Sequence, residues 1–62
     1  MKKMDIILTN GIFSYDLDII EENSASYYVE NMYGTIYRVS KKDGKVYNGK
    51  ILMGIIEKID IF

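Results

Sequence analysis

Apolar and polar residues alternate with a period of two through the first part of the chain. From residue 13 to 19 every second side chain is apolar, and the sequence reads Phe13, Ser14, Tyr15, Asp16, Leu17, Asp18 and Ile19. A strand points successive side chains to opposite faces, so this pattern is typical of a strand with one face in a core and the other in water. We predict a strand here, with its acidic side chains turned to solvent.

A hairpin is predicted just before this strand. The apolar run from Ile6 to Leu8 ends at Asn10-Gly11, the pair that most readily adopts the two positive φ angles of a type I′ turn. A two-residue turn places Leu8 opposite Phe13, Ile6 opposite Tyr15 and Asp5 opposite Asp16. The expected core face of the hairpin is then Ile6, Leu8, Phe13 and Tyr15.

Further short strands follow, separated by turn-forming residues. The polar segment 21–26 precedes an apolar segment at 27–31, and Gly34 precedes another at 35–39. Their expected inward side chains are Tyr27, Val29, Tyr37 and Val39. Asp43-Gly44 predicts a third turn, and Asn48-Gly49 a further turn or a bulge, because residues 45–47 between them are short for a strand.

The C-terminal segment 50–62 has two interpretations. Ile51, Leu52, Ile55, Ile56 and Ile59 fit the apolar stripe of a short helix. The isoleucine content and Gly54 disfavour a helix interior, however. We favour extended structure bent at Gly54, with the helix as the alternative.

Together these elements predict a single all-β domain over residues 1–62. Four or five antiparallel strands joined by tight turns describe a small curled meander or an SH3-like or OB-like barrel. A chain of 62 residues forms a small core, and neither a disulfide nor a histidine or cysteine metal site can reinforce it, because the chain has no Cys and no His. We expect a homo-oligomer or a complex with a partner, against the alternative of a well-packed monomer.

Charge is segregated along the chain although the net charge is only −1. Residues 4–31 contain six acids and no base, whereas residues 32–50 contain five bases and one acid. Oppositely charged patches govern encounter and orientation with partners more than they govern fold. The pattern therefore indicates binding, but it does not identify the partner.

The sequence argues against catalysis, a cofactor and a membrane anchor. Without His or Cys the usual proton shuttle and thiolate nucleophile are missing, and the acids show no metal-loop spacing. The apolar run at 6–8 is too short for a signal peptide, and no stretch is long enough to span a bilayer. We expect a cytoplasmic protein that is not an enzyme and holds no metal.

The first functional hypothesis is a non-catalytic protein-binding module. Its acidic face would dock on a basic partner protein through Asp5, Asp16, Asp18, Glu21 and Glu22. Exposed tyrosines, which are enriched at interfaces, would anchor the complex: Tyr28, Tyr33 and Tyr47. The Ile-, Lys-, Asn- and Tyr-rich composition is typical of an AT-rich coding sequence and is compatible with a phage or mobile-element inhibitor or adaptor.

Two alternatives stay open. A single-stranded nucleic-acid binder would use the bases of residues 38–50 for phosphates, with tyrosines for stacking: Arg38, Lys41, Lys42, Lys45 and Lys50. A self-associating structural subunit would pair its dipolar strands without any charged partner. Either charged set is also explained by solubility alone.

Overall fold

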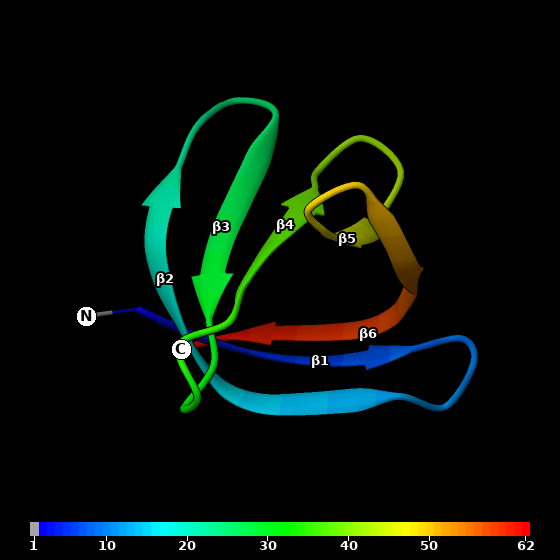
Figure 1. Cartoon of the computed structure of the whole chain (residues 1–62), viewed down its shortest axis with the longest axis horizontal. Helices are drawn as coiled ribbons and strands as arrows, with labels where there is room; N and C mark the ends of the chain where they lie inside the picture. Colours follow the sequence, from blue (N-terminus) through cyan, green and yellow to red (C-terminus); the bar gives the residue numbers. More distant parts are fainter. Residues whose placement is uncertain (1) are drawn as a thin grey trace.

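The computed structural model describes residues 2–62, which form a six-stranded antiparallel barrel. The strands are β1 (Lys3–Leu8), β2 (Phe13–Glu22), β3 (Ser26–Glu30), β4 (Ile36–Ser40), β5 (Lys45–Asn48) and β6 (Ile51–Ile61). Each strand pairs with the next, and β6 returns beside β1 to close the sheet (Figure 1). Backbone hydrogen bonds between Lys3 and Phe62 complete the closure, at 2.7 and 2.9 Å.

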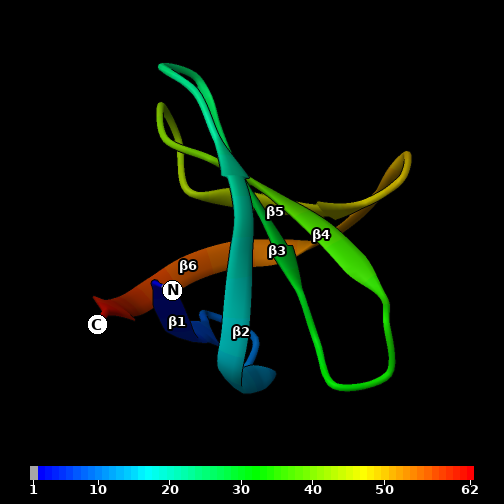
Figure 2. The same cartoon turned by 90° about the vertical axis from the view of Figure 1, so that its left-hand side faces the viewer.

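The all-β small-barrel prediction is confirmed, with one more strand than expected. Residues 45–48 do form a strand although they are few, because β5 pairs with β4 at Val39–Val46 and with β6 at Val46–Gly54. The C-terminal segment is extended, as favoured, and the alternative of a short helix is wrong. β6 curves strongly (Figure 2), so that its first half lies along β5 and its second half along β1.

The bend in β6 depends on Gly54. The register shifts here, since Val46 pairs with Gly54 while Tyr47 pairs with Leu52, which leaves Met53 as the extra residue of a bulge. A Cβ atom on Gly54 would lie 3.0 Å from Leu8 Cδ1 and 3.0 Å from Asn10 Nδ2. The absence of a side chain therefore lets β6 pass close to the end of β1.

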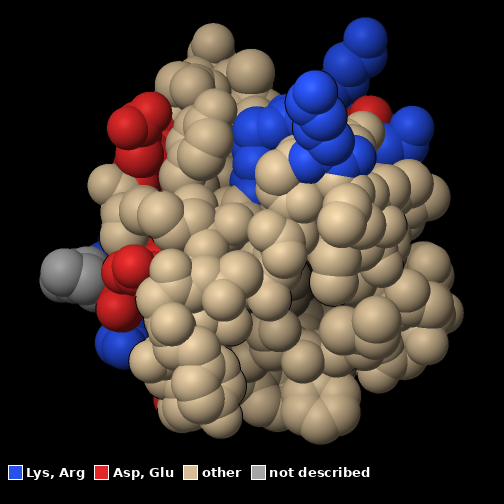
Figure 3. Space-filling model, viewed as in Figure 1, with Lys and Arg blue, Asp and Glu red and all other residues tan. Residues whose placement is uncertain are grey.

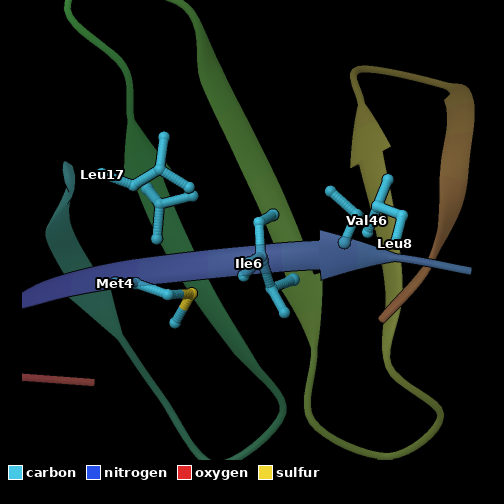
Figure 4. Packing of buried hydrophobic residues seen from close by; sticks show 7 residues of the cluster. Met4, Ile6, Leu8, Leu17 and Val46 are labelled. Carbon is cyan, nitrogen blue, oxygen red and sulfur yellow. The ribbon is translucent and has the colours of Figure 1, made fainter. Parts of the chain in front are cut away.

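The core consists of inward side chains supplied by the first five strands (Figure 4). The buried apolar residues are Met4, Ile6, Leu8, Leu17, Val29, Val39 and Val46. Ile19, Tyr27, Tyr37, Met53 and Ile56 pack against them. The expected inward positions in residues 17–39 are thus confirmed.

Phe13 and Tyr15 were expected in this core, and that prediction is wrong. They are 61% and 56% exposed. The turn after β1 is longer than two residues, so Phe13 pairs with Ile7 instead of Leu8, and Ser14 takes the inward position opposite Ile6. A bulge at Tyr15 and Asp16 then restores the inward position of Leu17.

Candidate functional site

The five predicted acidic residues do not form one uninterrupted acidic face. Asp18 pairs with Lys3 at 3.1 Å, and Glu22 pairs with Lys41 at 2.7 Å. Asp5 lies on the outer side of β1, and its Oδ1 accepts a hydrogen bond from the backbone N–H of Asp16. Carboxylates appear as separate patches at the left edge of the face in Figure 3, and two of the five predicted acids already have a lysine partner.

The Glu22–Lys41 pair ties the end of β2 to the turn after β4. The ammonium nitrogen of Lys41 also lies 4.6 Å from the centre of the Tyr27 ring, a cation–π distance. The hydrogen bond from Lys41, more than its charge, holds the pKa of Glu22 below its ordinary value. Lys41 therefore has a structural role on this side of the barrel.

The remaining predicted bases lie on β4, on β5 and in the turns at their ends. Arg38 is on β4, Lys45 begins β5, and Lys42 and Lys50 are in the turns before and after β5. Lys and Arg side chains gather at the top of the face shown in Figure 3, while its middle is uncharged. The charge segregation of the sequence is thus visible as separate regions of the surface.

Asp43 is the acid among these bases, and it shapes the turn. Its Oδ1 accepts a hydrogen bond from the backbone N–H of Lys45 at 3.0 Å. This bond is the main reason that the pKa of Asp43 is below its ordinary value, with a second contribution from Ser40. Asp43 is fully engaged in turn formation.

Two of the predicted tyrosines lie on either side of Arg38. Tyr28 is directly opposite Arg38 across β3 and β4, and Tyr47 is directly opposite it across β4 and β5. The guanidinium carbon of Arg38 is 4.5 Å from the centre of the Tyr47 ring. Cross-strand pairing continues this outward row at both ends: Glu21, Tyr28, Arg38, Tyr47 and Leu52.

The third predicted tyrosine, Tyr33, is at the tip of the β3–β4 turn. Met32 and Tyr33 are 84% and 85% exposed, the highest values among the large apolar and aromatic side chains of residues 2–62. The turn is nevertheless fixed, because Asn31 Oδ1 accepts hydrogen bonds from the N–H groups of Tyr33 and Thr35, each at 2.9 Å. A rigid turn thus presents two exposed side chains to solvent.

A shallow hollow of about 360 Å³ lies beside the tyrosine row, between Ile36 and the turn after β5. Tyr28, Ile36, Arg38 and Gly49 line it, and Ile36 is 47% exposed. We call the set of Tyr28, Met32, Tyr33, Ile36, Arg38 and Tyr47 the tyrosine–arginine face. It contains all three predicted tyrosines and one predicted base, and the predicted acid Glu21 borders it opposite Tyr28.

Met32 and Ile36 were not among the sequence-based site residues. Alternation does place Ile36 on the same side of its strand as Arg38, so the signal for Ile36 was present. The exposure of Met32 follows from the turn that Asn31 organises. No residue-type pattern in the sequence indicates that turn geometry.

Within residues 2–62, no three Asp or Glu side chains come together in a way that would hold a metal ion. The same residues include no helix of the length and hydrophobicity needed to cross a membrane. Comparison of the chain with protein families, with curated proteins and with solved structures found no match.

Proposed function

We propose that this chain is a non-catalytic protein-binding module and that the tyrosine–arginine face is its contact surface. The observation that carries the proposal is the position of Arg38, between Tyr28 and Tyr47 on adjoining strands. Tyrosine and arginine are the residue types most often found as energetic centres of protein interfaces. The barrel wall holds their backbones in place, so little ordering is needed on binding.

The apolar surroundings of Arg38 support a protein partner. Ile36 and the hollow beside it offer a site for an apolar side chain, while Met32 and Tyr33 protrude from a fixed turn. Glu21 lies opposite Tyr28, and Glu30, two residues after Tyr28, lies on the same side of β3 as Tyr28. These carboxylates would repel a phosphate chain but would suit a partner that carries both charge signs.

The acidic set has a different role in this proposal from the one that the sequence suggested. Because Asp18 and Glu22 are each paired within the chain, they gain less from an external base than free carboxylates would. The contact energy is therefore assigned to the tyrosines and Arg38. The segregated charges would act at longer range, by orienting the partner as it approaches.

Single-stranded nucleic acid is the second candidate, and one observation favours it. Lys45 shares the outward side of β5 with Tyr47, and Lys50 lies in the adjoining turn. Tyr47 could stack on an unpaired base while Arg38 and these lysines neutralise phosphates. Such binding would be strongly weakened by salt.

Site-specific photo-crosslinking tests both candidates. A benzophenone amino acid is placed at position 33 or 47, where it replaces one aromatic side chain by another, and the protein is irradiated in a lysate of its source. We expect a protein adduct from both positions, sensitive to protease and resistant to nuclease. Loss of that adduct when Arg38→Ala is added would place the contact on the tyrosine–arginine face.

A matched control uses Phe13, an exposed aromatic residue at the start of β2, a strand that pairs with β1 and β3 and not with β4 or β5. Benzophenone at position 13 should not give the adduct formed from positions 33 and 47. Equal yields of that adduct from all three positions would mean nonspecific capture and would overturn the proposal. Nuclease-sensitive adducts from position 47 would establish the nucleic-acid candidate in its place.

A further inference from the structure

A second group of exposed aromatic side chains lies on the wall formed by β1, β6 and the first half of β2. Phe13 and Tyr15 have ring centres 5.2 Å apart at an interplanar angle of 32°. More than half of each side chain is exposed. In Figure 1 β1, the second half of β6 and the first half of β2 run along the lower side of the barrel, while the first half of β6 turns upward to pair with β5. Two adjoining exposed aromatic rings offer apolar area that an interface can bury.

Beside this pair is a hollow of about 230 Å³ that contains both charge signs. It is lined by Asp5, Ile7, Tyr15, Lys58 and Asp60. Asp5 is directly opposite Asp60 across β1 and β6, and Ile7 is directly opposite Lys58. Like charges in direct cross-strand opposition are unfavourable unless a cation lies near them. Lys58 forms no ion pair within residues 2–62, although it lies on the same outward side as both carboxylates.

We propose that this wall binds a second copy of the same chain in a two-fold symmetric dimer. In a two-fold interface the same patch is present on both sides, so it must complement itself. This patch does: Lys58 of each copy can approach the partner's Asp60, and both ion pairs form at once. Phe13 of each copy then covers the partner's hollow and is removed from water.

The proposed dimer would also supplement a small core. Seven apolar side chains are buried inside the barrel, whereas aromatic area remains outside it at Phe13 and Tyr15. Pairing of two such walls buries this area without using β4 or β5. The tyrosine–arginine face would therefore remain accessible in the dimer, so that either proposal can fail without the other.

A charge-swap experiment tests the proposed dimer directly. Sedimentation equilibrium of the wild type across the micromolar range should show a reversible dimer. Lys58→Glu makes the patch wholly acidic, and Asp60→Lys makes it basic apart from Asp5. We expect each variant alone to be monomeric, and an equimolar mixture of the two to form a heterodimer. In this heterodimer the side chain at position 58 of each copy faces a side chain of opposite charge at position 60 of the other copy.

Two further variants separate the interface from effects on folding. Phe13→Ser should weaken the dimer at least tenfold, whereas Met32→Ser, at a more exposed apolar residue in the β3–β4 turn, should leave it unchanged. Far-UV circular dichroism checks that each variant is folded, and the charge-swapped mixture shows that neither partner has lost its fold. A monomeric wild type, or a mixture that fails to associate, would overturn the proposal. So would a dimer that Phe13→Ser does not affect.

Discussion

Asp5 Oδ1 accepts a hydrogen bond of 2.8 Å from the backbone N–H of Asp16, on the neighbouring strand. Asp16 is the one residue other than glycine with a positive φ angle in residues 2–62, at 56°. It sits in the bulge that separates the Met4–Leu17 pair from the Ile6–Ser14 pair. The Asp5 carboxylate thus supports the backbone of Asp16. The side-chain pattern alone had suggested that these two acids face each other across the hairpin.

The bulge predicts a specific order of stability among Asp16 variants. A left-handed backbone costs a residue with a Cβ about 1–2 kcal/mol, while glycine adopts it freely. Asp16→Ala should therefore be less stable than Asp16→Gly by about 1 kcal/mol, despite the usual preference for alanine within a strand. Urea unfolding of the two variants measures this difference. Equal stability, or a more stable alanine variant, would show that the bulge is absent.

The contribution of the Asp5 carboxylate to stability can be measured separately. Asp5→Ala removes the carboxylate that accepts the Asp16 N–H and should lower the free energy of unfolding by about 0.5–1.5 kcal/mol, the range for a typical intramolecular hydrogen bond. Asp5→Asn keeps an acceptor oxygen and serves as the matched control. If both variants lose the same stability, the effect comes from the charge of Asp5 and not from the hydrogen bond.

Gly54 is expected to be intolerant of any side chain. A Cβ there approaches Leu8 and Asn10 to 3.0 Å, so Gly54→Ala should cost about 1–3 kcal/mol through displacement of the β1 end. Gly34, like Gly54, has a positive φ angle, of 83°, but nothing lies within 4 Å of the place that an added Cβ would occupy. Gly34→Ala should therefore show backbone strain alone, and a smaller loss of stability than Gly54→Ala. Thermal unfolding of both variants gives the comparison.

The Glu22–Lys41 pair predicts an acid-sensitive contribution to stability. The folded state holds the pKa of Glu22 below its ordinary value of 4.5, chiefly through the hydrogen bond from Lys41. The contribution is therefore complete above the ordinary pKa and is lost as the pH falls through the lower folded-state pKa. Unfolding measured at a series of acidic pH values should show a shallower pH dependence for Lys41→Met than for the wild type. An identical dependence would mean that the pair does not form in solution.

Core packing sets the largest expected loss of stability. Leu17 is fully buried, so Leu17→Ala should cost about 2–5 kcal/mol, a large share of the stability of a small domain. Ile20 is the extra residue of a second bulge in β2 and is 47% exposed. Ile20→Ala should change stability by less than about 1 kcal/mol. Equilibrium unfolding in urea distinguishes the two positions.

The sequence predicted the strands better than the register between them. Alternation placed Leu17, Val29 and Val39 inward because side chains of a barrel strand alternate between its two sides wherever no bulge interrupts the strand. It placed Phe13 inward as well, because the length of the turn at Asn10-Gly11 is not encoded in that period. Two hydrogen bonds fix a loop longer than two residues: Ile12 N–H donates to Asn10 Oδ1, and Gly11 N–H donates to the Leu8 carbonyl. The structure shows this loop, and the alternation does not indicate it.

The site was predictable residue by residue but not as a grouping. Tyr28, Tyr47 and Arg38 were each identified from the sequence, and pairing across three strands then placed Arg38 between the two tyrosines. The first hypothesis had grouped the three tyrosines with the acids, whereas the nucleic-acid alternative had grouped Arg38 with the lysines and with tyrosines for stacking. Only the order of strands in the barrel shows which of them are neighbours.

The affinity of the crosslinked protein partner for the Arg38→Ala variant tests the account most directly. With purified components, Arg38→Ala should weaken binding at least about tenfold, as expected for the centre of an interface. Arg38 is not part of the buried core, so the fold should be retained, and Lys58→Ala, in the hollow beside β1, should bind as the wild type does. Arg38→Ala binding with wild-type affinity would contradict the assignment of function to the tyrosine–arginine face.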